Sequence, residues 1–299
     1  PQGPGPTIRQ GRSQVNGTAL LRLFLATGAS TLLGAGCASY SPLESHYNRG
    51  VEYYDDGRLP DAIREYRMAI EDNPTNIRAH YNLAVCNHDQ GQKVDAETEY
   101  DAVLRLDPEN ARALVSLSSL KADEGKDAEA VELLEKAAAA DRHSGFPKSS
   151  LGAYYERKGE LDRALEAYKA SVSIEPGHVT GHAGIARILA RRGAYQDAAA
   201  EYELALAIDG EDIATLLAAS EAQERIGEIK SAMLLLEHAL IYVKDRPALW
   251  IRLAKYYESQ DRLEDAVAAI WEARGVDPGN PEVGSRLKSL YGRLAARER

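Results

Sequence analysis

ELDRALEAYKASVSIEP, residues 160–176, contains the pattern that decides the fold. A small residue, Ala164, is followed by a large one, Tyr168, and the stretch ends at Pro176, where a helix would stop. Similar stretches recur along the chain, and each has an alanine in the place of Ala164. These alanines are each 34 residues apart, without insertions: Ala62, Ala96, Ala130, Ala164, Ala198, Ala232 and Ala266. The chain is therefore predicted to repeat one structural unit seven times.

Each unit is predicted to fold as two antiparallel helices, which makes the protein all-α. If the first unit begins at Leu43, the alanines occupy position 20, and position 8 is also small, as at Gly50 and Gly152. Small residues at these positions let the two helices approach closely, while large residues at position 24 fill the space toward the next pair. Position 15 is glycine in six units and Asp261 in the seventh, which predicts a left-handed residue after each first helix.

This strict pattern resembles the tetratricopeptide repeat (TPR). The resemblance implies an α-solenoid in which seven helix-turn-helix repeats occupy residues 43–280. Residues 281–299 begin with Pro281 and place Leu287 and Leu290 on one side of a further helix, so they are expected to form a C-terminal capping helix. We therefore expect no separate catalytic domain within residues 43–299.

Residues 1–36 differ from the rest and are expected to be a leader and signal peptide. Residues 23–36, LFLATGASTLLGAG, are uncharged and too short to cross a bilayer, as in an export signal. The following LLGAGC, residues 32–37, resembles the lipobox of bacterial lipoproteins, although Gly34 stands where leucine is usual. The resemblance implies lipidation of Cys37, with residues 37–42 as a short linker. A plain secretory signal and an accidental apolar stretch are the alternatives.

A lipid on Cys37 would hold the first repeat beside a membrane, since six residues separate Cys37 from Leu43 and span about 20 Å when extended. Ala38 follows the cysteine and lacks the aspartate that retains some lipoproteins in the inner membrane. The expected location is therefore the bacterial cell envelope, on the periplasmic face of the outer membrane.

Composition and motifs argue against nucleic-acid binding and catalysis. The formal net charge is -10, with 46 acidic and 36 basic residues, and a surface this acidic repels phosphate backbones. The sequence contains no nucleotide-binding or hydrolase motif, so we expect neither enzyme activity nor a cofactor. His178 and His182 are four residues apart, but no cysteine or acid nearby completes a metal site. Cys86 is expected to be a buried apolar residue.

The TPR resemblance also implies where partners bind. TPR proteins bind extended peptides or helices in a groove lined by first helices, chiefly through positions 2, 5, 9 and 12. An alternative for Tyr47 and Tyr81 is that they pack against the neighbouring helix. The candidate groove residues are Tyr47, Val51, Tyr54, Arg78, Tyr81, Val85, His88, Arg187, Glu221, Arg225 and Lys255.

The leading hypothesis is a non-catalytic TPR lipoprotein that recruits protein partners for cell-envelope assembly, such as pilus biogenesis. One alternative is a soluble TPR adaptor without a lipid anchor. Another is a regulatory subunit that attaches to an enzyme.

Overall fold

The structure is a computed structural model that describes residues 42–297, and this part contains fifteen α-helices and no strand. Fourteen of the helices form seven pairs, and the fifteenth follows the last pair. The first helices are α1 (Pro42–Asp55), α3 (Ile77–Asp89), α5 (Ala111–Asp123), α7 (Phe146–Arg157), α9 (Val179–Arg191), α11 (Ile213–Arg225) and α13 (Pro247–Ser259). The second helices are α2 (Leu59–Asp72), α4 (Lys93–Leu106), α6 (Asp127–Ala140), α8 (Leu161–Ile174), α10 (Tyr195–Ile208), α12 (Ile229–Tyr242) and α14 (Leu263–Val276). The last helix is α15 (Pro281–Arg297).

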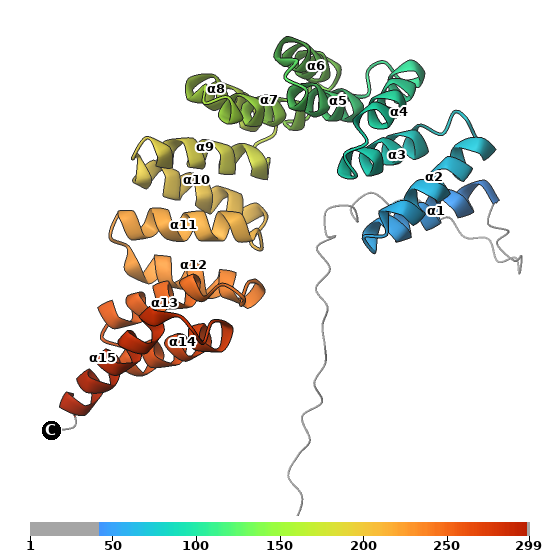
Figure 1. The fold of residues 1–299 in the computed structure, drawn as a ribbon. Coiled ribbons are helices and arrows are strands. Elements are labelled where there is room, and N and C mark those ends of the chain that lie inside the picture. Colours follow the sequence, from blue (N-terminus) through green and yellow to red (C-terminus); the bar gives the residue numbers. More distant parts are fainter. Residues whose placement is uncertain (1–41, 298–299) are drawn as a thin grey trace, which may run out of the picture. The chain divides into compact units, whose positions relative to one another are not determined.

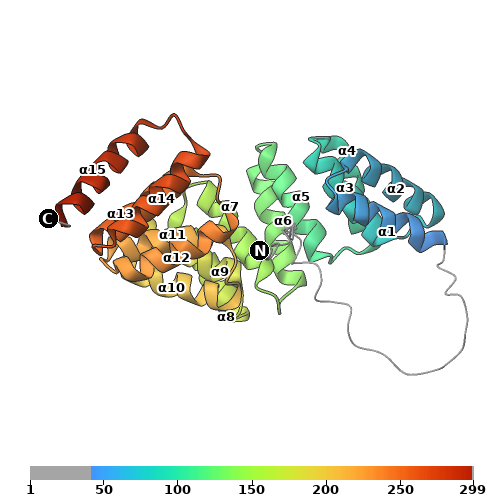
Figure 2. The ribbon, with the colours of Figure 1, turned by 90° about the horizontal axis from the view of Figure 1, so that it is seen from below.

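The helices, drawn in chain order in Figures 1 and 2, belong to two units. Each unit has buried hydrophobic clusters of its own. The first unit ends at Leu106 and contains α1–α4, with Tyr66, Leu83 and Cys86 in its core. The second unit begins at Asp107 and contains α5–α15, in which each helix contacts the next in the chain. Within it, α5 also contacts α7, α7 contacts α9, and α9 contacts α11, so first helices of successive pairs are neighbours.

The spacing of small and large residues explains the packing within each pair. All seven position-20 alanines have no exposed surface, from Ala62 to Ala266. At position 24, Tyr168 is also fully buried and lies between two glycines of neighbouring first helices. A Cβ atom added to Gly152 or to Gly184 would come within 2.7 or 2.5 Å of the Tyr168 ring. The predicted all-α fold of seven repeated helix pairs is therefore confirmed.

The turn inside each pair depends on a left-handed residue. Gly159 follows the first helix of the fourth pair with φ +77°, and no side-chain contact would oppose a Cβ there. Asp261 takes the same place in the seventh pair with φ 61°. Because a left-handed conformation costs an L-residue about 1–2 kcal/mol, the backbone conformation explains why glycine fills the other positions.

Several helices begin with a side-chain cap. Asn110 accepts a hydrogen bond from the backbone N–H of Ala113 at 3.1 Å, and Asp212 accepts one from Thr215 at 3.0 Å. Such caps satisfy N–H groups that have no partner inside the helix.

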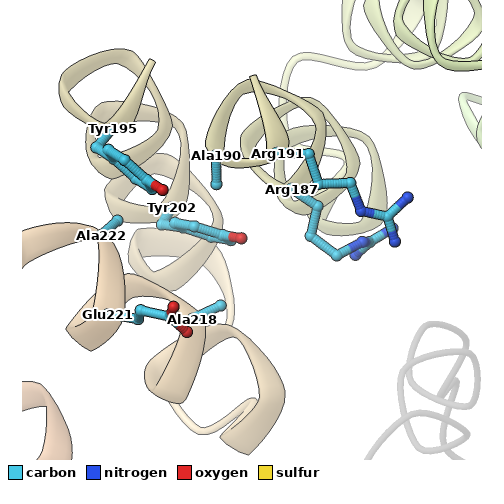
Figure 3. Close-up of a pocket in the computed structure, with 8 residues that line it drawn as sticks. All are labelled: Arg187, Ala190, Arg191, Tyr195, Tyr202, Ala218, Glu221 and Ala222. Carbon is cyan, nitrogen blue, oxygen red and sulfur yellow. The ribbon is translucent and has the colours of Figure 1, made fainter. Parts of the chain in front are cut away.

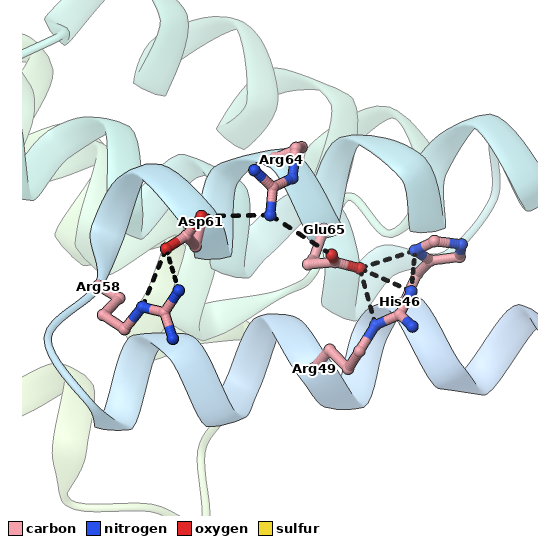
Figure 4. Close-up of polar contacts among 6 residues, drawn as sticks. All are labelled: His46, Arg49, Arg58, Asp61, Arg64 and Glu65. Atoms are coloured by element: carbon pink, nitrogen blue, oxygen red, sulfur yellow. Dashed lines mark hydrogen bonds and ion pairs between the residues drawn. The ribbon is translucent and has the colours of Figure 1, made fainter.

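Histidine and glutamate join the first and second helices of three pairs. Glu65, Glu99 and Glu201 occupy the same position of their second helices, and each contacts the Nδ1 atom of a histidine nineteen residues earlier, at 2.6–2.7 Å. In the first pair, Arg49 Nε also donates to Glu65 at 3.0 Å, which places two side chains of α1 on one carboxylate of α2 (Figure 4). These contacts fix the two helices at one register.

The two histidines considered as metal ligands engage separate protein groups. His182 contacts Glu201 through Nδ1 and the Pro176 carbonyl through Nε2, at 2.7 and 2.9 Å. His178 contacts the Ser149 hydroxyl through Nε2 at 2.8 Å. Within the described residues, no group of three or more potential metal ligands converges.

The last helix packs against α14. Val283, Leu287 and Leu290 of α15 are buried, and the hydroxyl of Tyr291 accepts a hydrogen bond from Trp271 Nε1 of α14 at 3.0 Å. The opposite side of α15 carries charged residues such as Lys288, which is exposed. This amphipathic arrangement is what solvates the end of a helical stack.

Candidate functional site

Within each unit, we call the surface formed by positions 2, 5, 9, 12 and 13 of the first helices the first-helix face. In the first unit it carries seven of the predicted residues, and the structure brings several of them together. Arg78 of α3 lies over the Tyr47 ring of α1, with its guanidinium carbon 5.0 Å from the ring centre. The Tyr54 hydroxyl of α1 donates to Asp89 of α3 at 3.1 Å. These residues therefore link successive first helices.

The tyrosines of this unit also pack toward the second helices. The rings of Tyr47 and Tyr66 lie 6.0 Å apart, as do those of Tyr81 and Tyr100. Tyr47 and Tyr81 remain partly exposed, although their rings pack toward second helices and Arg78 lies over the Tyr47 ring.

The remaining predicted residues of the first unit are less exposed than expected for a free recognition surface. Val51 packs against the core of the unit, and Val85 and His88 are half-buried. Burial and then the nearby Asp89 carboxylate raise the pKa of Tyr54 to about 12, so its phenol is protonated at neutral pH. The phenol therefore acts as a hydrogen-bond donor.

In the second unit, the first-helix face contains an ion-pair network centred on Glu156 of α7. Arg187 of α9 donates to this carboxylate through Nε and Nη2, at 3.2 and 2.8 Å, and Arg191 contacts it at 3.2 Å. Tyr168 donates from its hydroxyl to Glu156 at 2.9 Å. Burial opposes ionisation of Glu156, but these partners outweigh it and hold its pKa below the ordinary value.

Similar contacts recur farther along the stack. Glu258 of α13 accepts from Arg286 and from Arg293 of α15, both at 2.9 Å. Lys255 of α13, one of the predicted residues, lies 3.5 Å from Glu282 of α15. An acid near the end of one first helix therefore pairs with cations of the next, and part of the predicted recognition surface holds the repeats together.

A cavity of about 300 Å³ opens between α9, α10 and α11 (Figure 3). Two of the predicted residues, Arg187 and Glu221, line it. Arg225 lies beside it, over the Tyr195 ring at 5.2 Å and 3.9 Å from Glu221, whereas Lys255 is not part of the lining. The full lining is Arg187, Ala190, Arg191, Tyr195, Tyr202, Ala218, Glu221 and Ala222.

The chemistry of this cavity suits binding. Its polar groups are two guanidinium groups, one carboxylate and two phenols, and burial raises the pKa of Tyr202. A protonated phenol and an arginine are hydrogen-bond donors. The three alanines leave an apolar interior between these donors, a combination typical of ligand pockets.

Sequence reasoning missed Tyr195 and Tyr202 as lining residues of the cavity, and Glu156 as the ion-pair partner of Arg187 and Arg191. Tyr202 is at position 24, which was interpreted only as a core position, and Tyr195 begins a second helix. Glu156 could have been found from the sequence, because it is an acidic residue at position 12 of the repeat before Arg187 and could therefore pair with that arginine.

The predicted lipidation site, Cys37, lies outside the described residues. Among residues 42–297, no helix combines the length and apolar composition needed to cross a membrane. Cys86 is fully buried, and its burial raises the pKa of the thiol to about 12. A buried, protonated thiol agrees with the predicted structural role.

Comparison with known families identifies the repeats. A family described as "TPR repeat" matches residues 50–91, and one described as "Tetratricopeptide repeat" matches residues 89–144 and 150–213. No curated protein matches the chain.

Solved structures with the same fold include bacterial TPR proteins. The C-terminal part of a TPR repeat-containing protein from Cytophaga hutchinsonii is 14% identical, with 81% of this chain and 99% of that chain covered and a TM-score of 0.56. PilW, described as a widely conserved type IV pilus biogenesis factor, is 16% identical, with 67% and 93% covered and a TM-score of 0.54. Pseudomonas aeruginosa PilF is 20% identical, with 84% and 97% covered and a TM-score of 0.51. At these identities the similarity concerns the fold.

Proposed function

Because the chain belongs to the tetratricopeptide repeat family, we propose that it is a non-catalytic scaffold that binds protein partners on its first-helix face. The observation that carries this proposal is the cavity between α9, α10 and α11, which combines an apolar interior with hydrogen-bond donors on that face. Tyrosine and arginine, which line it, are the residue types enriched at protein interfaces.

The proposal extends to a lipid anchor at Cys37 and to a role in cell-envelope assembly. LLGAGC, residues 32–37, supports the anchor, and the shared fold with PilW makes pilus biogenesis one candidate process. The test of the anchor is incorporation of radiolabelled palmitate in cells. Label on the wild-type chain and none on Cys37→Ser is the expected result, whereas equal labelling of both would contradict anchoring at Cys37.

Partner binding can be tested by co-purification from detergent-solubilised membranes. A variant with Arg78→Glu, Arg225→Glu and Lys255→Glu reverses three exposed cations of the first-helix face. It is expected to lose the proteins that co-purify with the wild-type chain, because like charges across an interface disfavour binding.

The matched control reverses three exposed cations of second helices, Lys136→Glu, Lys169→Glu and Lys230→Glu. It makes the same change in net charge and is expected to keep the partners. Loss of the partners in the control alone would place binding on the second helices and overturn the proposal.

A further inference from the structure

The cavity between α9, α10 and α11 has an apolar interior of limited size. Tyr202 is 2% exposed, and Ala190, Ala218 and Ala222 leave space where larger side chains would fill it. A volume of about 300 Å³ is at the small end of ligand pockets. It suits a single side chain of a partner better than an extended cofactor.

One edge of the cavity carries more positive than negative charge. Arg187 and Arg191 share the single carboxylate of Glu156, and Arg187 already occupies both of its oxygens. The Arg191 side chain is 53% exposed, so it can contact a further anion. Figure 3 shows both guanidinium groups together on one side of the cavity, with Tyr195 on the other.

The opposite edge is closer to neutral. Glu221 lies 3.9 Å from Arg225, and Arg225 also covers the Tyr195 ring. An incoming carboxylate is therefore repelled by Glu221 less than it would be by an unpaired acid, and it is attracted to the Arg191 edge. This local charge contrasts with the net charge of -10 of the whole chain.

We infer that the cavity receives an apolar side chain of an extended peptide, while a neighbouring Asp or Glu side chain of that peptide pairs with Arg191. The inference rests on the proposed partner-binding function and specifies the chemistry of the partner. Arginine binds carboxylates through parallel N–H donors, and such charge-assisted bonds are stronger than neutral ones.

The test is selection of random peptides displayed on phage, fused at their C-termini so that no free α-carboxylate is present. Peptides with an acidic residue next to an apolar residue are expected to be enriched on the purified full-length protein. The selected peptides are then synthesised with amidated C-termini and a fluorescent label, and their dissociation constants are measured by fluorescence anisotropy.

Arg191→Ala is expected to raise the dissociation constants of these peptides by about tenfold, because one charge-assisted contact is lost. Arg192→Ala is the matched control, since it removes the same charge from the adjacent residue, which pairs with Asp162 instead of lining the cavity. The Arg192→Ala variant is expected to bind the peptides with the same affinity as the wild type.

A second variant tests the apolar part. Ala218 lines the cavity and is partly exposed, so Ala218→Leu is expected to fill the space and abolish binding without lowering the melting temperature. Three outcomes would each overturn the inference. The selected peptides could lack an enrichment in Asp or Glu, they could bind Arg191→Ala as tightly as the wild type, or no peptide could be selected at all. If these results occurred while membrane partners still depended on the cations of the first-helix face, the proposed function would stand without this specificity.

Discussion

Arg187 of α9 donates two hydrogen bonds to the carboxylate of Glu156 on α7, at 3.2 and 2.8 Å. This pair joins the first helices of two successive repeats, and Glu156 is only 9% exposed. Arg187 was expected to be a recognition residue, and the structure also gives it a role in stacking. Arg187 therefore helps to hold successive repeats together and also lines the cavity between α9, α10 and α11.

Glu156→Gln should destabilise the protein, because it leaves two arginines without their buried anion. The expected loss is about 1–3 kcal/mol, measured from urea denaturation at neutral pH. The control is Glu132→Gln, which removes an exposed partner of Lys136 and should change stability little. Equal effects of the two substitutions would show that the Glu156 network does not contribute to stacking.

Stability should also depend on pH through Glu156. Its pKa in the folded chain lies below the ordinary value of 4.5, so the unfolded chain binds this proton more readily. The stabilisation is complete above the ordinary pKa and is lost as pH falls through the lower folded pKa. The difference between wild type and Glu156→Gln should therefore shrink below about pH 4 in urea denaturation. A difference that stays constant from pH 6 to pH 3 would contradict the assignment.

Ala164→Leu should overpack the crossing of α7 and α8. Ala164 has no exposed surface, and a larger side chain must displace its neighbours, at a cost of about 1–3 kcal/mol. Ala139→Leu, at an exposed position of α6, is the control and should be tolerated. Thermal unfolding followed by circular dichroism distinguishes them. An unchanged melting temperature for Ala164→Leu would argue against the register.

Two glycine-to-alanine substitutions should change the stability of the protein in opposite directions. Gly159→Ala places a side chain at φ +77° and should destabilise by about 1 kcal/mol. Gly275 lies within α14 with no atom near its missing Cβ, so Gly275→Ala should stabilise by about 0.5–1 kcal/mol. Denaturation midpoints provide the measurement, and a shift of the same sign in both variants would be inconsistent with the backbone description.

The fold could be predicted from the sequence because the repeat is strictly periodic. Ala164 and Tyr168 have counterparts at the same interval in the other repeats. The sequence therefore shows seven times which positions must be small and which large for the helices to pack. The left-handed conformation predicted at position 15 is adopted even by Asp261, in the one unit in which glycine is replaced.

The site was only partly predictable. Arg187 and Glu221 were selected from their repeat positions and do line the cavity, but the cavity itself depends on the space that alanines such as Ala218 leave between helices. The pairing of Arg187 with Glu156 depends on how successive repeats stack. Neither feature follows from the pattern within a single repeat.

The most direct test of the partner-binding claim is photocrosslinking in the cells that make the protein. A photoreactive benzoylphenylalanine is placed either at Glu221, on the first-helix face beside the cavity, or at Leu234, an exposed position of the second helix α12. Crosslinking of a partner protein from position 221 and not from position 234 is the predicted result. Crosslinks from position 234 alone, or from neither position, would contradict the account.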